Sequence, residues 1–179
     1  LPQLISALSI AGATGPVTME GTLVVQTAET LAGITLVQLV REGTPVVIGG
    51  QSTSAAMRYG TLSIGAPEMA INTAATAQLA RFYNLPSRSG GALTDSKLCD
   101  SQSGSESMMG QLMSTLSGIN FVLHSAGMLE TYMVASYEKF ILDDEICGTC
   151  KRIKIGENIT EERLAVDLIS EVGPGGEYL

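Results

Sequence analysis

Short apolar segments alternate with longer helix-like segments along this chain of 179 residues. Each short segment is apolar at successive positions and ends in glycine or a polar residue, which is typical of strands buried on both faces of a parallel sheet. The longer segments are rich in good helix formers, and Pro67 suits a first helical turn, where no backbone N–H is needed. The pattern predicts strands at 4–10, 44–50, 85–88 and 119–125, and helices at 18–40, 67–83, 101–116, 134–153 and 158–172.

A strand followed by a helix, repeated four times, predicts βα units on a parallel sheet and places the chain in the α/β class. Four such units form either an open doubly wound sheet or half of a (β/α)8 barrel, since a complete barrel takes about 250 residues. The helix at 18–40 is apolar almost all round, which favours the barrel because more protein must cover its sides. We expect residues 1–179 to be one partial TIM-barrel domain, roughly the C-terminal half with about four βα units. The uncovered inner face of half a barrel favours a homo-oligomer or a longer native chain.

Charge and hydropathy exclude several classes of function. Ten basic residues against eighteen acidic ones give a net charge of −8, which would repel a nucleic acid backbone. The longest apolar segment, Val17 to Val40, is interrupted by Glu20, Gln26 and Glu29, so we expect no membrane-spanning helix. No basic leader or cleavage signal opens the sequence, which predicts a cytoplasmic protein.

Cysteine and glycine motifs add no cofactor site. Cys147 and Cys150 form one CxxC pair, which cannot complete a tetrahedral zinc site without further ligands, so helix packing is the favoured interpretation and we expect no bound metal. The glycine-rich segment 11–15 lacks both the complete G-x-G-x-x-G pattern and the P-loop pattern of nucleotide sites. The absence of G-x-S-x-G argues against a serine hydrolase.

Candidate functional residues lie where strands end and helices begin, because active groups of parallel α/β folds gather at this edge. His124, the only histidine, ends the fourth predicted strand, and it is either a satisfied structural group or a functional one. A phosphate-binding barrel would need basic groups here, and Arg58, Arg88 and Lys97 supply some, but neighbouring acids offset them. The loops concerned are 11–15, 49–60, 89–97 and 124–132.

Acidic and aromatic residues share these loops. Asp95 and Glu130 follow strands, with Tyr59, Tyr132 and Tyr137 in or just beyond the same loops. Carboxylates combined with aromatic faces bind quaternary or protonated ammonium groups through charge and cation–π attraction. The alternative is that Asp95 caps the following helix and that the tyrosines lie at the rim of the site.

Three long segments resemble the trimethylamine:corrinoid methyltransferase family, in order and nearly end to end. They are "SIAGATGPVTMEGTLVVQTAETLAGITLVQLVREGTPVVIGG", "GAPEMAINTAATAQLARFYNLPSRSGGALTDSK" and "AGMLETYMVASYEKFILDDEICG". The resemblance implies a (β/α)8 barrel of well over twice this length, of which this chain is the later half. It also implies methyl transfer from a methylated amine to the Co(I) of a separate corrinoid protein, in anaerobic one-carbon metabolism such as methanogenesis. The enzyme itself would bind no cofactor, since the partner carries the corrinoid.

In the trimethylamine enzymes of that family the key residue is pyrrolysine, and the resemblance places Ala92 at its position, between "SGG" and "LTDSK". Alanine offers no electrophile to activate a tertiary amine, whereas a quaternary ammonium leaves as a neutral amine once it is held in line with cobalt. We therefore expect a member without pyrrolysine that acts on a quaternary amine such as glycine betaine. Trimethylamine remains the alternative substrate if Ala92 stands for a translated amber codon or an engineered replacement. A catalytically incompetent binding or packing module is the other alternative.

The same hypothesis assigns roles to the candidate residues. Asp95 and Glu130 balance the substrate charge, and three tyrosines, Tyr59, Tyr132 and Tyr137, line the cage together with Ala92. His124 contacts a substrate carboxylate or positions the corrinoid.

Overall fold

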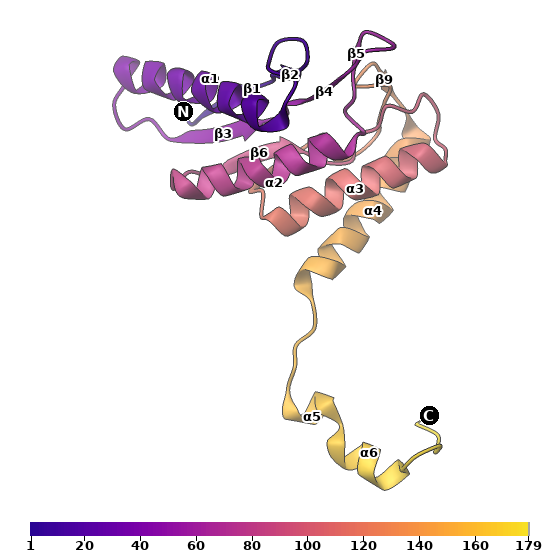
Figure 1. The fold of residues 1–179 in the computed structure, drawn as a ribbon. Helices are drawn as coiled ribbons and strands as arrows, with labels where there is room; N and C mark the ends of the chain where they lie inside the picture. The colour runs from indigo at the N-terminus through magenta and orange to yellow at the C-terminus, as the bar shows by residue number, and fades with distance from the viewer. Residues whose placement is uncertain (179) are drawn as a thin grey trace.

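Four parallel strands form the main sheet of the computed structural model, which describes residues 1–178 (Figure 1). Their order is β1-β3-β6-β7, so each strand is added beside the preceding one, and all neighbours run parallel. A doubly wound sheet reverses its strand order, and this sheet does not. The predicted α/β class and its parallel sheet are confirmed, with strands β1 (Gln3–Ala7), β3 (Val46–Gly50), β6 (Ser87–Gly90) and β7 (Phe121–Leu123).

A helix follows each of these strands, and each helix begins where local chemistry satisfies its first N–H groups. The Thr18 side chain caps α1, Pro67 occupies the first turn of α2, Asp100 forms a capping box with Ser103 at α3, and Ser136 caps α4. Consecutive helices pack against each other in chain order. Their bounds are α1 (Met19–Val40), α2 (Pro67–Phe82), α3 (Ser101–Ser117) and α4 (Tyr137–Ile155).

The connecting segments hold more structure than the sequence predicts. The first predicted strand is divided, and the loops after β3 and β7 contain short strands of their own: β2 (Ile10–Ala11), β4 (Thr53–Ala56), β5 (Thr61–Leu62), β8 (Met128–Leu129) and β9 (Val134–Ala135). The predicted helix start at Val134 was wrong, because Val134 pairs with Leu129 in the β8–β9 hairpin. These strands are too short for a periodic pattern to reveal them.

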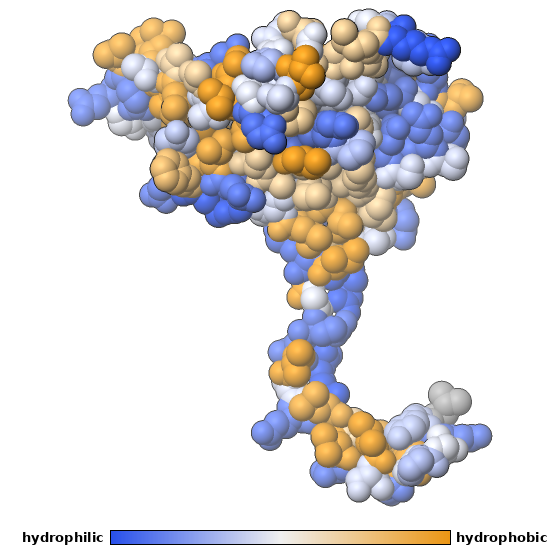
Figure 2. All heavy atoms as spheres, in the orientation of Figure 1, coloured by the Kyte–Doolittle hydropathy of each residue, from blue (hydrophilic) through white to orange (hydrophobic). Residues whose placement is uncertain are grey.

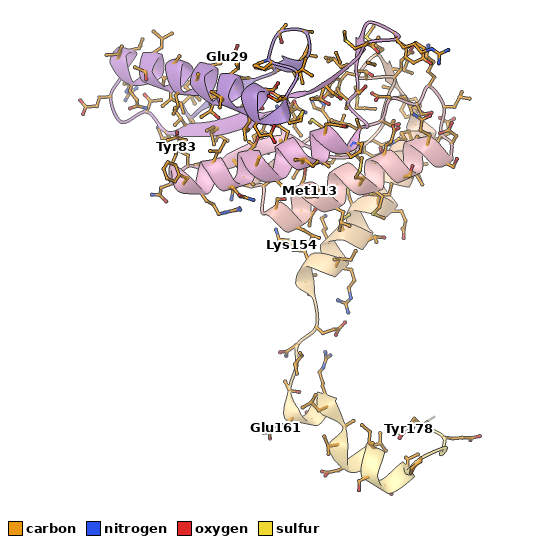
Figure 3. All side chains as sticks on the ribbon, viewed as in Figure 1. Glu29, Tyr83, Met113, Lys154, Glu161 and Tyr178 are labelled. Carbon is orange, nitrogen blue, oxygen red and sulfur yellow. The ribbon has the colours of Figure 1, made fainter. Side chains whose placement is uncertain are left out.

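The C-terminal residues form two short helices instead of the single predicted one. They are α5 (Glu161–Leu164) and α6 (Val166–Val172), and Ala165 between them has a left-handed φ of 50° that ends the first helix. Both project away from the sheet, as the labelled Glu161 and Tyr178 show in Figure 3.

Helix α1 turns three polar side chains inward. Thr22, Gln26 and Thr30 are buried, and the Gln26 amide donates to Thr76 Oγ1 (2.9 Å) and accepts from the side chain of Asn72 (3.0 Å). Its exposed side carries large apolar residues, including Val24, Leu36, Leu39 and Val40, and apolar side chains gather at this end of the molecule in Figure 2. Among the described residues, α1 alone has the length and hydropathy that a membrane-spanning helix needs, which is a statement of composition only.

Beside the sheet, a small apolar cluster supports the loops at the strand ends. Ile64, Met69 and Leu93 are buried together, and Met128 and Tyr132 pack against them. The cluster therefore joins α2 to the loops that follow β5, β6 and β7.

Candidate active site

Arg88 lies on the face of the sheet opposite the helices. Its neighbour Ser89 bonds to Thr73 of α2 (3.0 Å), and side chains alternate along a strand, so Arg88 points the other way. There its Nη1 donates to Gln51 Oε1 (2.6 Å) and Ser6 Oγ (3.3 Å). Strands β1 and β6 and the end of β3 thus converge on one guanidinium group.

Arg88 is 6% exposed, and within residues 1–178 it makes no ion pair. Its Nε also has no hydrogen-bond partner there, and burial lowers the pKa of Arg88 from its usual value. A buried charge is normally paired, because taking it out of water costs several kcal/mol. Arg88 therefore has the properties of a site for an anionic group.

Tyr132 and His124 lie against this group. The Tyr132 hydroxyl accepts from Gln51 Nε2 (2.7 Å), so Gln51 connects the tyrosine to Arg88, and the Tyr132 and His124 rings meet edge to face with centroids 4.8 Å apart. Burial raises the pKa of Tyr132 to about 12. Burial and the Arg88 charge lower the pKa of His124. At neutral pH the site therefore presents a protonated phenol, a neutral imidazole and one positive charge.

The loop that carries Tyr132 has an unusual backbone. Glu130, Thr131 and Tyr132 have φ values of 47°, 53° and 73°, and His124 is also left-handed with φ 54°. A residue other than glycine loses roughly 1–2 kcal/mol in this conformation, and such strain gathers at functional sites. The loop after β6 holds these residues in place, since Glu130 N donates to the Ser96 carbonyl (2.8 Å) and Thr131 N to the Thr94 carbonyl (3.1 Å).

The two predicted acids are both engaged by the protein. Asp95 Oδ1 accepts from Ile64 N (2.9 Å) and from Thr131 Oγ1 (2.9 Å), which ties three loops together. The alternative that Asp95 caps the following helix was wrong, since Asp100 caps α3. Glu130 pairs with Lys97 (2.8 Å) near the surface.

The other predicted residues are spread over different environments. Tyr59 and Tyr137 are 73% and 91% exposed, whereas Ala92 is fully buried. Of the predicted aromatic cage, only Tyr132 lies beside His124 and Arg88 in the described part of the chain. From the sequence, Arg88 is expected only as a basic group of a phosphate site, and Gln51 is not predicted at all. An arginine in a strand of otherwise small residues was the available signal.

Within residues 1–178, no cluster of three or more His, Cys, Asp or Glu side chains could hold a metal ion. The predicted packing of the cysteine pair is confirmed: Cys147 Sγ contacts the Ser125 carbonyl (3.5 Å), and the buried Cys150 lies against Met108 (3.8 Å). Burial raises the pKa of both thiols, which makes them poor nucleophiles.

Comparison with known proteins identifies the family. The model of the family described as trimethylamine methyltransferase (MTTB) matches residues 1–179. The chain is 53% identical over 98% of its length to a glycine betaine methyltransferase of Desulfitobacterium hafniense, covering 37% of that protein. It is 40% and 39% identical, over its whole length, to trimethylamine methyltransferases of Methanosarcina acetivorans and Methanosarcina barkeri, covering 36% of each.

The parallel α/β sheet and this family match place the chain in a family of methyltransferases. The chain belongs to the trimethylamine methyltransferase (MTTB) family, and it spans little more than a third of the length of the curated relatives it matches.

Proposed function

We propose that the complete enzyme transfers a methyl group from a quaternary amine that bears a carboxylate, such as glycine betaine, to the Co(I) of a partner corrinoid protein. The observation that carries this proposal is that Arg88 is buried beside Tyr132 and His124 and makes no ion pair within residues 1–178. The higher identity to a glycine betaine methyltransferase than to the trimethylamine methyltransferases supports the same substrate class.

Arg88 matches the substrate carboxylate in charge and hydrogen bonding. Guanidinium N–H groups bind carboxylates strongly, and Arg88 Nε, which has no hydrogen-bond partner within residues 1–178, leaves a donor for such an anion. The Tyr132 hydroxyl already accepts from Gln51, so its own proton is available to a second acceptor. Trimethylamine has no carboxylate and would leave the Arg88 charge buried and unpaired.

The reaction needs orientation more than acid–base chemistry. Co(I) attacks the methyl carbon, a cobalt–carbon bond forms, and the carbon–nitrogen bond breaks with its electron pair remaining on nitrogen. A quaternary amine then leaves as a neutral tertiary amine, and no proton has to move. Ala92 is fully buried, which fits a loop that contributes no activating side chain. Tyr132 offers an aromatic face to the ammonium group.

We further propose that the chain is part of a (β/α)8 barrel whose strand ends face the corrinoid partner. Three features support this: the strands follow one another in parallel order, the sheet has unpaired edges at β1 and β7, and the exposed side of α1 is apolar. Asp95 and Glu130 then contribute negative charge around the substrate, while Tyr59 and Tyr137 would need a partner surface to join the cage.

The test uses the complete enzyme with its corrinoid protein reduced to Co(I), and follows methyl-cobalt formation by absorbance. Glycine betaine is compared with choline, which is quaternary but has no carboxylate, and with trimethylamine. We expect turnover of glycine betaine, and we expect Arg88→Met to raise its KM at least ~30-fold while Arg88→Lys retains part of the affinity. Turnover of trimethylamine alone, or an unchanged KM in Arg88→Met, would contradict the proposal.

A further inference from the structure

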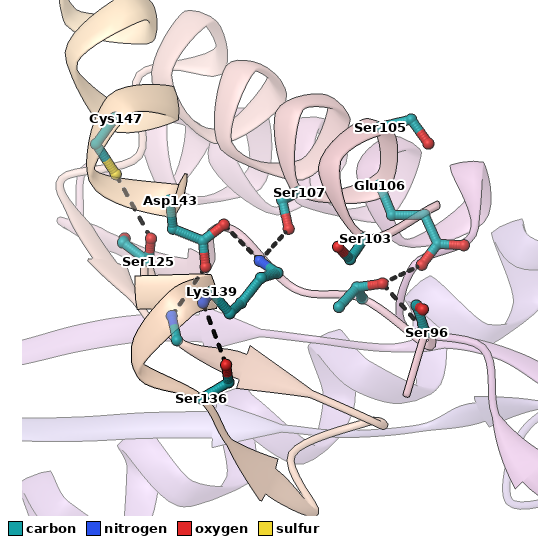
Figure 4. A network of polar contacts seen from close by, with 12 residues as sticks. Ser96, Ser103, Ser105, Glu106, Ser107, Ser125, Ser136, Lys139, Asp143 and Cys147 are labelled. Carbon is teal, nitrogen blue, oxygen red and sulfur yellow. Dashed lines mark hydrogen bonds and ion pairs between the residues drawn. The ribbon is translucent and has the colours of Figure 1, made fainter. Parts of the chain in front are cut away.

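Helix α4 contains a fully buried ion pair outside the site described above. The side chains of Lys139 and Asp143 are both 0% exposed, one helical turn apart. Lys139 Nζ donates to Asp143 Oδ1 and to Ser107 Oγ of α3 (2.6 Å), as Figure 4 shows. The ammonium and carboxylate groups thus join two helices.

Such a pair is a poor source of stability in itself. Removing two charges from water is costly, and well-packed apolar residues of similar volume often replace a buried ion pair with no loss. The role of this ion pair therefore depends on the other groups that its charged atoms bind. Asp143 Oδ2 accepts from the backbone N–H of Gly127 (2.8 Å), which stands at the entrance to the β8–β9 hairpin.

Gly127 and Ser136 close the base of this hairpin. Gly127 has a left-handed φ of 80°, and its carbonyl accepts from Ser136 N (3.0 Å). Ser136 in turn caps α4, where its hydroxyl accepts from Lys139 N (3.2 Å). Both ends of the hairpin are therefore fixed to the first turns of α4, one through the Ser136 side-chain cap and the other through the Asp143 carboxylate.

The tip of the same hairpin carries the left-handed residues Glu130, Thr131 and Tyr132. This conformation persists only where the surroundings determine it strongly. The loop after β6 fixes the tip through the carbonyl groups of Thr94 and Ser96, and α4 fixes the base. If either attachment is lost, the tip can relax and move the Tyr132 ring relative to His124.

We infer that Asp143 is a positioning residue: its buried side chain, which lies against Lys139, accepts from Gly127 N and so holds the 127–136 hairpin in the shape that presents Tyr132 to the site. The anchoring itself is independent of the reaction, and only its consequence for substrate binding rests on the proposed function.

Two double variants separate the anchor from the charge. Lys139→Met with Asp143→Leu removes both charges and the acceptor for Gly127, whereas Lys139→Met with Asp143→Asn removes the charges and keeps an acceptor. Amide hydrogen exchange of this chain, read by mass spectrometry, reports the hairpin directly. We expect the leucine pair to speed exchange at 127–135 by at least ~10-fold, with β3 and α2 unchanged, and the asparagine pair to restore protection.

Equal hairpin exchange in the leucine pair and the wild type, with the fold intact, would overturn the inference. So would exchange that rises equally in both double variants, since that result assigns the effect to charge and not to the Gly127 anchor. If the leucine pair does not fold, Lys139→Met with Asp143→Ala makes the same comparison, because alanine is too short to reach Gly127.

The complete enzyme gives a second readout. The leucine pair should raise the KM for glycine betaine about 10-fold and the asparagine pair should restore most of it, since the Tyr132 contact depends on the hairpin. Localised exchange without turnover of any betaine would confirm the anchor and reject the proposed function. Localised exchange with an unchanged KM would reject the positioning role.

Discussion

Gly110 of α3 lies directly against the backbone of the loop that contains Ala92. A Cβ atom added at Gly110 would be 2.5 Å from the carbonyl oxygen of Gly91, whereas ordinary contact begins at 3.4 Å. Gly104, in the same helix, has open space in this direction, with nothing within 4 Å. The two glycines therefore make a matched pair for an alanine substitution.

Alanine is favoured over glycine in a helix interior by about 1 kcal/mol, so Gly104→Ala should stabilise the chain by roughly 0.5–1 kcal/mol. Gly110→Ala gains the same propensity but forces α3 away from Gly91, and overpacking of this kind costs about 1–3 kcal/mol. The contact is with a backbone oxygen, so we expect a cost toward ~3 kcal/mol and a net loss of about 2 kcal/mol. For a chain of this length each kcal/mol of stability shifts Tm by roughly 2–4 °C. The Tm should therefore rise in Gly104→Ala and fall in Gly110→Ala.

Urea unfolding followed by far-UV circular dichroism measures both variants under identical conditions. Equal stabilisation by the two alanines would refute the reasoning, because it would mean that α3 does not press on the Gly91 carbonyl. If Gly110→Ala folds, the displaced loop should also weaken glycine betaine binding, which Gly104→Ala should leave unchanged.

Three further predictions concern the site. The raised pKa of Tyr132 means that the folded state holds the phenol proton more tightly than the unfolded state does. This contribution to stability is complete below about pH 10 and is lost toward pH 12. Tyr132→Phe should therefore flatten the decline of Tm over this range. The lowered pKa of His124 acts in the opposite sense, so stability from this group is lost as pH falls below about 6.5, and His124→Gln should reduce that loss in an acid titration. Asp95→Asn keeps an acceptor for Ile64 and Thr131, so its Tm should be unchanged. Asp95→Ala removes the acceptor and should lower the free energy of urea unfolding by about 1–3 kcal/mol. If Asp95→Asn lowers kcat/KM without changing Tm, the negative charge of Asp95 acts on the substrate.

The sequence predicted the four main strands and their helices because each has a strong local signal. Pro67 marks the start of α2, and frequent alanines continue that helix. The hairpin at 128–135 was missed because two-residue strands have no period, and its shape depends on contacts with the distant Ser96 and Asp143. Hairpins of this kind are determined by tertiary structure.

The candidate site was likewise predicted only in part from the sequence. Their positions after strands placed His124 and Tyr132 at the same edge of the sheet, where parallel strands gather their carboxyl ends, and the two rings do contact each other. The sequence could not predict that Gln51 connects Tyr132 to Arg88, because this contact spans residues far apart in sequence. Nor could it show that Asp95 is used by the protein backbone, since hydrogen-bond partners are not visible in residue types alone.

The polar side chains that α1 buries have a consequence for how substitutions act on this helix. Gln26 donates to Thr76 and accepts from Asn72, so an apolar residue at position 26 would leave both partners without this buried contact and should destabilise the chain. Polar residues in place of the exposed Val24, Leu36 or Leu39 should change the stability of the isolated chain much less.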